Sequence, residues 1–376
     1  MFTFREPQEW WALGGELGLR PHGPTAGFGP YASFRQLERS LGPPAPPPAH
    51  WSHWLHGVYR GRPVLVINYE SGSGSNRSTE TVAVAQIDPP LFLGVSIARE
   101  GFLSDLFGGT DVQLGDPVLD AELRLGAFDG ARLAEFLRPN PANASLLHAL
   151  VRGVRTGMHV TDSTVVFSMR GLVSDRRSIA TSLDEAIGVA AHLAARRASF
   201  PLTEAERLHV AEWRAYAEAN GLTFDPSRME LAGKMNDTTV RIGLETNGGR
   251  MHTSVTVTWP QAFPVSLRLH KKSSLSFLAS LFTDEIVTGD LAFDDRFSIQ
   301  GSPEASVRAL FASAELRGSL VRLAPYASEV TMNGAGCFWL WPGAVVAGAH
   351  LDEHVKLALR MSHALFGSAR AAGPFR

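Results

Sequence analysis

The stretch Leu114-Gly-Asp-Pro-Val-Leu-Asp120 has a counterpart in the second half of the chain, Thr288-Gly-Asp-Leu-Ala-Phe-Asp294. Both stretches carry the pattern Gly-Asp-x-x-x-Asp with the same internal spacing. Self-similarity of this kind is the sequence signature of a repeated architecture. A single match of this length arises by chance, so its flanks decide whether the chain contains a repeat.

The flanking sequence contains further matches, and they occur in the same order in both halves. The matched segments are Trp10 with Trp213, Gly18-Leu19 with Gly221-Leu222, Leu55-His-Gly57 with Leu231-Ala-Gly233, Val64 with Val240, Thr81-Val-Ala-Val84 with Ser254-Val-Thr-Val257, Val160-Thr161 with Val330-Thr331, and Leu183-Asp-Glu185 with Leu351-Asp-Glu353. The order predicts two tandem copies of one domain, residues 1–198 and 203–376. The main difference is an insertion at about 23–50 in the first copy. It contains Gly42-Pro-Pro-Ala-Pro-Pro-Pro48, which favours polyproline II over helix or central strand.

The hydrophobic periodicity of each copy predicts an α+β fold. In the second copy we expect helices at 203–219, 275–282, 303–323 and 351–366, strands at 265–270 and 296–300, and hairpins at 238–259 and 329–341. In the first copy we expect strands at 63–69, 81–86 and 91–97, a hairpin at 158–169 and a helix at 183–197. Hairpins and helices without regular β-α-β alternation indicate a mostly antiparallel sheet in each copy, with helices packed on one face.

Composition indicates a globular protein without a strong charge preference. Lys and Arg (35) nearly balance Asp and Glu (37), whereas nucleic-acid binders usually carry a basic excess. The single cysteine, Cys337, excludes an intramolecular disulfide. The chain shows neither a signal-peptide pattern nor an apolar run of about 18 residues, the length needed to cross a bilayer. We therefore expect a soluble cytoplasmic protein that neither binds nucleic acid nor inserts into a membrane.

The segment His350-Leu-Asp-Glu353-His354 matches the H-x-x-E-H pattern of inverted zinc proteases. On a helix, His350 and His354 lie one turn apart and face the same side, with Glu353 placed to activate water. The first copy has Ser182-Leu-Asp-Glu185-Ala186 at the matched place, which lacks both histidines. Acidic groups in a first helical turn also have an ordinary role, since they favour the positive end of the helix dipole.

A second candidate is His50-Trp51-Ser-His53-Trp54-Leu-His56, which follows the proline-rich insertion. Three histidines at intervals of three would gather a metal on a helix. The alternative is a partner-binding aromatic surface made by Trp51, Trp54, His53 and His56, because Trp is enriched in interface hot spots. On this interpretation, removal of residues 23–56 is expected to weaken partner binding and leave the fold intact.

The repeated Gly-Asp motif is the third candidate, comprising Gly115, Asp116 and Asp120 with Gly289, Asp290 and Asp294. Paired carboxylates suit a divalent cation or acid–base chemistry. Gly-Asp is also an ordinary turn pair, in which Asp accepts backbone N–H groups. Occurrence in both copies favours the turn, since a catalytic site commonly persists in only one copy of a duplicate.

The run from Thr288 to Ile299, with Trp213 and Gly221-Leu222 upstream, resembles uncharacterised bacterial domains that carry the pattern G-D-x-x-F-D-x-x-F-x-V. Ile299 stands where the pattern has Val, and the first copy departs at Leu119 and Leu123, where the pattern prefers Phe. The resemblance implies no activity, because these domains have none established.

The sequence favours a non-enzymatic scaffold or adaptor that binds another protein and needs no cofactor. Two other functions remain open. One is a small-molecule or lipid-binding protein with a cavity between sheet and helices, and the other is a metal-dependent hydrolase that uses His350, Glu353 and His354.

Overall fold

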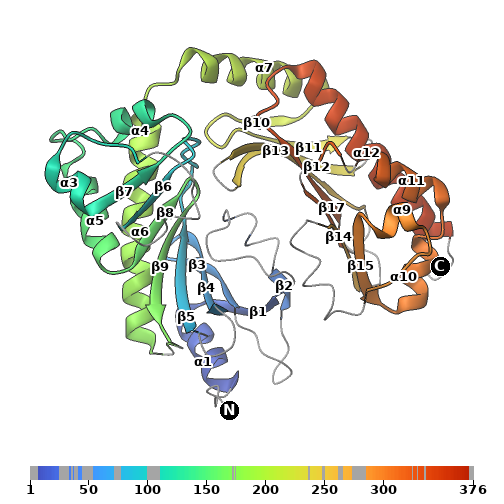
Figure 1. Ribbon diagram of the computed structural model, residues 1–376, viewed down its shortest axis with the longest axis horizontal. Coiled ribbons are helices and arrows are strands. Elements are labelled where there is room, and N and C mark those ends of the chain that lie inside the picture. The colour runs from blue at the N-terminus through green and yellow to red at the C-terminus, as the bar shows by residue number, and fades with distance from the viewer. Residues whose placement is uncertain are drawn as a thin grey trace. The chain divides into compact units, whose positions relative to one another are not determined.

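The computed structural model describes residues 7–24, 34, 37, 41–44, 54–71, 78–99, 111–171, 173, 175–235, 238–247, 250–260, 266–272, 285–323, 325–327, 329–333 and 336–371. The chain forms two compact units. The first comprises Met1–Pro201 with Thr246–Arg250, and the second comprises Leu202–Glu245 with Met251–Arg376. Figure 1 shows that each unit combines helices with a sheet.

The first unit is an antiparallel sheet with helices beside it. Its elements are α1 (Pro7–Leu17), β1 (Arg20–Pro24), β2 (Leu41–Pro44), β3 (Trp54–Tyr59), β4 (Arg62–Ser71), β5 (Ser78–Gln86), β6 (Ser96–Arg99), α3 (Pro117–Glu122), β7 (Leu123–Gly126), α4 (Gly130–Leu137), α5 (Ala144–Arg155), β8 (Met158–Thr161), β9 (Thr164–Arg170) and α6 (Arg176–Ser199). The strands lie in the order β2-β1-β3-β4-β5-β9-β8-β6-β7. All their recorded pairings are antiparallel.

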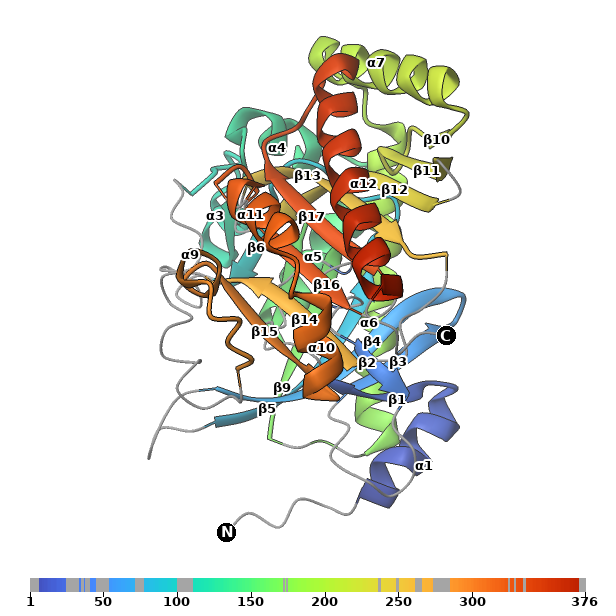
Figure 2. The same cartoon turned by 90° about the vertical axis from the view of Figure 1, so that its right-hand side faces the viewer.

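The second unit has the same kind of sheet. Its elements are α7 (Glu204–Asn220), β10 (Thr223–Asp225), β11 (Glu230–Met235), β12 (Thr238–Asn247), β13 (Arg250–Thr258), β14 (Ser266–Lys271), α9 (Leu291–Asp294), β15 (Phe297–Ser302), α10 (Glu304–Leu310), α11 (Ala314–Leu323), β16 (Glu329–Asn333), β17 (Gly336–Pro342) and α12 (Gly348–Ala371). The strand order is β10-β11-β12-β13-β17-β16-β14-β15, which matches the first sheet except for β2. Figure 2 shows α12 running across β17 with α11 beside it.

Local sequence explains where α7 begins and ends. Thr203 accepts the Glu206 backbone N–H at 3.1 Å, and the Glu206 carboxylate accepts the Thr203 N–H at 2.7 Å. This reciprocal pair is the capping box that the sequence predicts, and it satisfies two N–H groups that lack helical partners. The helix stops at Gly221, whose φ of 65° lies in the left-handed region that a glycine adopts without strain.

The expectation of a mixed helix and sheet fold with antiparallel pairing is confirmed, and several details differ. The predicted strand at 91–97 is wrong in its first part, because β6 begins only at Ser96. The backbone of Phe92 and Gly94 has positive φ, which interrupts an extended run. The helix expected at 303–323 is two helices, separated after Leu310. The helix expected at 275–282 lies outside the described residues.

The first sheet is buried on both faces. On one face, Val64, Val66, Ala83 and Ala85 belong to a hydrophobic core that they share with α1, α4, α5 and α6. On the opposite face, strand residues form a second core with Phe34 and Leu37 of the predicted insertion. These strand residues are Trp54, Leu65, Ile67, Val82, Val84 and Val166. Phe34 and Leu37 have no exposed surface. The segment 23–56, which we expect to be removable without loss of the fold, therefore contributes buried side chains to this core.

Side-chain hydrogen bonds show which residues of the two sheets correspond, and they correct the match made from sequence. Thr81 Oγ1 lies 2.8 Å from the Gly171 carbonyl oxygen and accepts the Val173 N–H at 2.8 Å. In the second sheet, Thr253 makes the same two bonds, at 3.0 Å to Gly343 and 2.8 Å from Val345. Thr81 thus corresponds to Thr253, one residue before the Ser254 that the sequence comparison paired with it.

Two other sequence pairings are also displaced. Val160 pairs with Ile97 and Val165, whereas Met332 pairs with Leu269 and Cys337 in the equivalent strands. Val160 therefore corresponds to Met332, two residues beyond Val330. In the closing helices, the buried residues Ile179, Leu183 and Ala186 have the same spacing as Leu351, Val355 and Ala358. Leu183-Asp-Glu185 therefore lies one helical turn beyond the counterpart of Leu351-Asp-Glu353.

A glycine permits a close approach at the same place in both sheets. A Cβ atom on Gly57 would lie 3.1 Å from the Leu19 side chain, and one on Gly233 would lie 2.8 Å from the Leu222 side chain. Both leucines follow a glycine with positive φ, which is Gly221 in the second unit. The matched Gly-Leu and Leu-x-Gly sequences therefore mark one packing contact in each unit.

Candidate functional site

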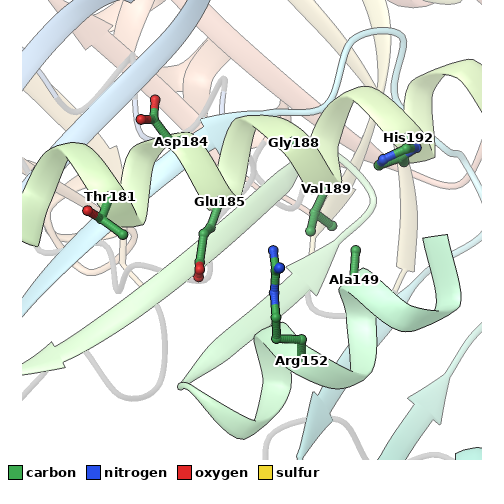
Figure 3. Close-up of a pocket in the computed structure, with 8 residues that line it drawn as sticks. All are labelled: Ala149, Arg152, Thr181, Asp184, Glu185, Gly188, Val189 and His192. Carbon is green, nitrogen blue, oxygen red and sulfur yellow. The ribbon is translucent and has the colours of Figure 1, made fainter. Parts of the chain in front are cut away.

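A cavity of about 280 Å³ lies between α5 and α6 of the first unit, and we call it the α5–α6 groove (Figure 3). Both helices are anchored beneath it by apolar residues of the first core, among them Leu150 of α5 and Leu183 of α6. Ala149 and Val189 project toward one another from the two helices in Figure 3. The groove is therefore fixed on packed helices rather than on loops, which holds its side chains in place.

The groove is hollow because small residues of both helices line it. Gly188 of α6 contributes no side chain, and a Cβ built there would meet nothing within 4 Å. Ala149 supplies only a methyl group from α5. A glycine inside a helix costs about 0.5–1 kcal/mol relative to alanine. A glycine inside a predicted helix, Gly188, is the sequence feature that could have indicated the groove.

Side chains of opposite charge enter the groove from its two walls. Arg152 extends from α5 toward α6, and Glu185 extends from α6 toward α5 (Figure 3). Within the described part of the chain, neither side chain makes a hydrogen bond or an ion pair closer than 4 Å. Arg152 lies in the last turn of α5, where a cation favours the negative end of the helix dipole. Both charges therefore remain available to a ligand.

Asp184 also lines the groove but is already engaged. Its Oδ2 atom forms an ion pair with Arg60 at 2.9 Å, and the aspartate side chain is 33% exposed. Its Oδ1 atom is buried and has no hydrogen-bond partner among the described residues. In Figure 3 the carboxylate points to the opposite side of α6 from Glu185. Asp184 therefore does not neutralise Arg152.

The structure does not assemble a metal site from His350, Glu353 and His354. His350 and Glu353 are exposed on α12. The His354 Nδ1 atom lies 2.7 Å from the His350 carbonyl oxygen, so this nitrogen is the donor of a helix hydrogen bond. The His354 ring packs edge-on against Trp341 with centroids 4.9 Å apart. In the described ranges, no group of three His, Cys, Asp or Glu side chains is arranged to hold a metal ion.

The histidine and tryptophan cluster of the insertion is only partly described. His50, Trp51 and His53 lie outside the described residues. Trp54 begins strand β3 and is 4% exposed within the second core, so it presents no aromatic surface to a partner. His56 is half-buried on the same strand and meets the His22 ring edge-on at 5.8 Å. Because Trp54 to His56 lie in an extended strand, they do not form part of a helical metal-binding cluster.

The Gly-Asp motif forms the same turn in both units. Asp120 accepts the backbone N–H groups of Leu114 and Gly115 at 2.7 and 3.0 Å. Asp294 accepts those of Thr288 and Gly289 at 3.0 and 2.9 Å, and the Thr288 hydroxyl at 2.8 Å.

The first aspartate of each motif caps the following helix. Asp116 accepts two N–H groups of α3, and Asp290 accepts one of α9. Gly115 and Gly289 have φ values of 77° and 82°, a conformation that glycine adopts without strain. All four carboxylates therefore hold backbone groups in place.

Asp290 has an additional partner on α11. Its Oδ2 atom accepts a hydrogen bond from Arg317 Nε at 3.0 Å, and this bond lowers the pKa of the Asp290 carboxyl. No described residue forms such an ion pair with Asp116. The equivalent turns therefore differ in electrostatic environment, although their backbone hydrogen bonds are alike.

A buried polar cluster in the first unit was not predicted from sequence. Asp162, in the β8–β9 turn, accepts the N–H groups of Leu93, Gly94 and Val95 at 2.8–3.0 Å. Burial raises the pKa of the Asp162 carboxyl, and these hydrogen bonds oppose the rise. The carboxylate explains why residues 91–95 form a loop instead of a strand, because it satisfies N–H groups that a neighbouring strand would otherwise accept.

His159 lies beside this cluster and is 1% exposed. Its Nε2 atom is 3.4 Å from Ser96 Oγ, and burial lowers the pKa of the His159 imidazole to about 4. The imidazole is therefore neutral at physiological pH. Cys337 of the second unit is likewise buried, and its Sγ atom accepts a hydrogen bond from Trp339 Nε1 at 3.0 Å.

Comparison with known proteins identifies no family. No family model matches the chain, and no curated protein matches it. One solved structure, that of the mycobacterial trehalose monomycolate transport factor A (TtfA), is similar with a TM-score of 0.31. The match has 10% sequence identity and covers 45% of this chain and 98% of that one. A likeness at this score supports no argument about fold or function. Over the described residues, no helix is both long and apolar enough to cross a membrane.

Proposed function

We propose that the protein is a non-enzymatic scaffold or adaptor, and that the α5–α6 groove of the first unit binds a segment of its protein partner. The observation that carries the proposal is the pair of opposite charges, Arg152 and Glu185, on facing helices, for which the described residues provide no ion pair within 4 Å. Charged groups placed in a fixed pattern select a partner by electrostatic complementarity.

The size of the groove supports a protein segment as the occupant. Pockets for drug-sized ligands enclose about 300–1,000 Å³, and this groove, at about 280 Å³, lies just below that range. Protein interfaces often centre on pockets that receive one anchoring side chain. Arg152, Glu185 and His192 bring charged and polar groups into the groove, and a few placed polar groups of this kind provide specificity.

We also propose that the two units are diverged copies of one ancestral domain, with the first specialised for binding. Shared strand order, the two Asp-containing turns and the Thr81 and Thr253 bridges support common descent. The residue that opens the groove differs in the second copy. The buried-residue spacing that aligns α6 with α12 places Arg360 at the position of Gly188.

A matched pair of variants tests the binding proposal. Gly188→Trp fills the groove from an open position on α6, and Arg360→Trp places the same side chain at the equivalent, exposed position of α12. Partners are recovered from native-host cells with the wild-type protein, and binding is then measured with the purified partner. We expect Gly188→Trp to weaken this binding at least tenfold and Arg360→Trp to leave it unchanged. Equal binding by all three proteins would reject the groove as the partner site.

A further inference from the structure

We infer that the α5–α6 groove recognises a C-terminal lysine or arginine of a polypeptide, with Arg152 binding its α-carboxylate and Glu185 its side-chain cation. The inference rests on the proposed function, because it names the chemistry of the partner segment. A carboxylate and a cation on one residue match the one positive and one negative group that face each other across the groove.

The two charges suit this pair of contacts. A guanidinium presents parallel N–H donors that match a carboxylate, so Arg152 is a suitable receptor for a terminal carboxylate. Glu185 is half-buried and accepts hydrogen bonds from an ammonium or guanidinium group. Since Asp184 pairs with Arg60 at 2.9 Å, it leaves Arg152 free for the ligand.

The uncharged walls of the groove suit the rest of the residue. Ala149, Gly188 and Val189 add uncharged surface to the groove beside the two charges. Lysine and arginine bury their methylene stems on apolar surface while the charged ends stay in polar surroundings.

Small probes isolate each charge. N-acetyl-L-lysine has the carboxylate and the ammonium, N-acetyl-L-lysine amide lacks the carboxylate, and N-acetyl-L-norleucine lacks the ammonium. Ligand-observed NMR with the full-length protein measures their affinities. We expect N-acetyl-L-lysine to bind most tightly, and loss of either charge to weaken binding about fivefold, the upper range for a solvent-accessible ion pair. Equal affinity for all three probes would overturn the inference.

Charge-swap variants identify the residues that bind. Arg152→Glu and Glu185→Lys should each remove binding of N-acetyl-L-lysine, and the double variant should restore it, because the ligand then binds in the reverse orientation. Gly188→Trp should also remove binding, whereas Arg360→Trp should not. Since Arg152 and Glu185 make no ion pair with a described residue, the unfolding midpoint should hardly change. A double variant as inactive as the singles, with an unchanged unfolding midpoint, would contradict the assignment.

Free lysine and a short peptide that ends in lysine separate the two sources of this chemistry. Binding of the peptide at least as tightly as free lysine supports a polypeptide terminus, and binding of free lysine alone overturns it.

The outcomes for the terminal-residue inference are distinguishable from those for the proposed function. If no probe binds but Gly188→Trp still loses the partner, the terminal-residue inference is wrong and the adaptor function stands. If probes bind with the expected charge dependence but Gly188→Trp keeps the partner, the adaptor function through this groove is wrong.

Discussion

The α5–α6 helix pair of the first unit and the α11–α12 pair of the second lie beside sheets of the same strand order, yet they present different surfaces. The first has a groove around Gly188, and the second has the long side chain of Arg360 at the aligned position. Both units keep the sheet bridges and the Asp-containing turn. The two units therefore share these backbone-holding hydrogen bonds and differ in the helix residue at this aligned position.

The largest effect is expected in the second core of the first unit. Phe34 is fully buried against the sheet face opposite the helices, so Phe34→Ala leaves a cavity there. We expect the free energy of unfolding of the first unit to fall by about 3–4 kcal/mol. Hydrogen exchange compares β4 of the first unit with β12 of the second. Unchanged protection in β4 would show that Phe34 contributes little to this core.

The next effect tests the feature that the units share. Asp294→Ala removes the acceptor for two N–H groups and one hydroxyl, whereas Asp120→Ala removes the acceptor for two N–H groups. We expect losses of about 2 and 1 kcal/mol, each confined to its own unit, because partly exposed hydrogen bonds to charged groups contribute about this much. Denaturant unfolding monitored by unit-specific hydrogen exchange measures both. A loss in only one unit would break the equivalence of the turns.

A smaller effect distinguishes the two turns by their pH dependence. The hydrogen bond from Arg317 lowers the pKa of Asp290 in the folded protein, so this aspartate stabilises the second unit above the ordinary pKa near 3.8. The stabilisation is lost as the pH falls from there through the lowered pKa. In Asp290→Asn, unfolding of the second unit should depend less on pH in that window. An identical acid-unfolding curve for the variant and the wild type would argue against the contribution of this ion pair.

The smallest effect concerns the groove glycine. Gly188→Ala should raise the free energy of unfolding by about 0.5–1 kcal/mol, because alanine favours the helix and its methyl group meets nothing within 4 Å. The matched control is Gly153→Ala on α5, where the added methyl group would lie 2.6 Å from the Met158 sulfur atom. The control should be destabilised. Differential scanning calorimetry measures both, and destabilisation of Gly188→Ala would show that this position is packed.

Much of the framework was predictable from sequence, because turns, caps and alternation are local. Thr203, Glu206 and Gly221 marked α7, and alternating residues marked β4, β5, β12 and β13. The residue-by-residue alignment of the two halves from sequence was less accurate, because small apolar residues repeat every few positions. Only hydrogen-bond partners such as Thr253 with Gly343 fixed it.

The groove itself was not predictable from local patterns. Arg152 and Glu185 lie 33 positions apart, and they meet only because α5 and α6 pack side by side. The second core was missed for a similar reason. The proline-rich segment favours polyproline II and gives no signal of burial, whereas Phe34 and Leu37 nearby are buried against strands far along the chain.

The side-chain hydrogen bonds of Thr81 and Thr253 enclose segments of equal length in the two units. Each threonine meets a carbonyl oxygen 90 positions later and an N–H group 92 positions later, in both units. The chain between these points therefore starts and finishes at the same two anchor points, although its helices differ. A chimera that transplants residues 81–171 in place of 253–343 would preserve both junctions. We expect such a chimera to keep the hydrogen bonds of the threonine at both junctions.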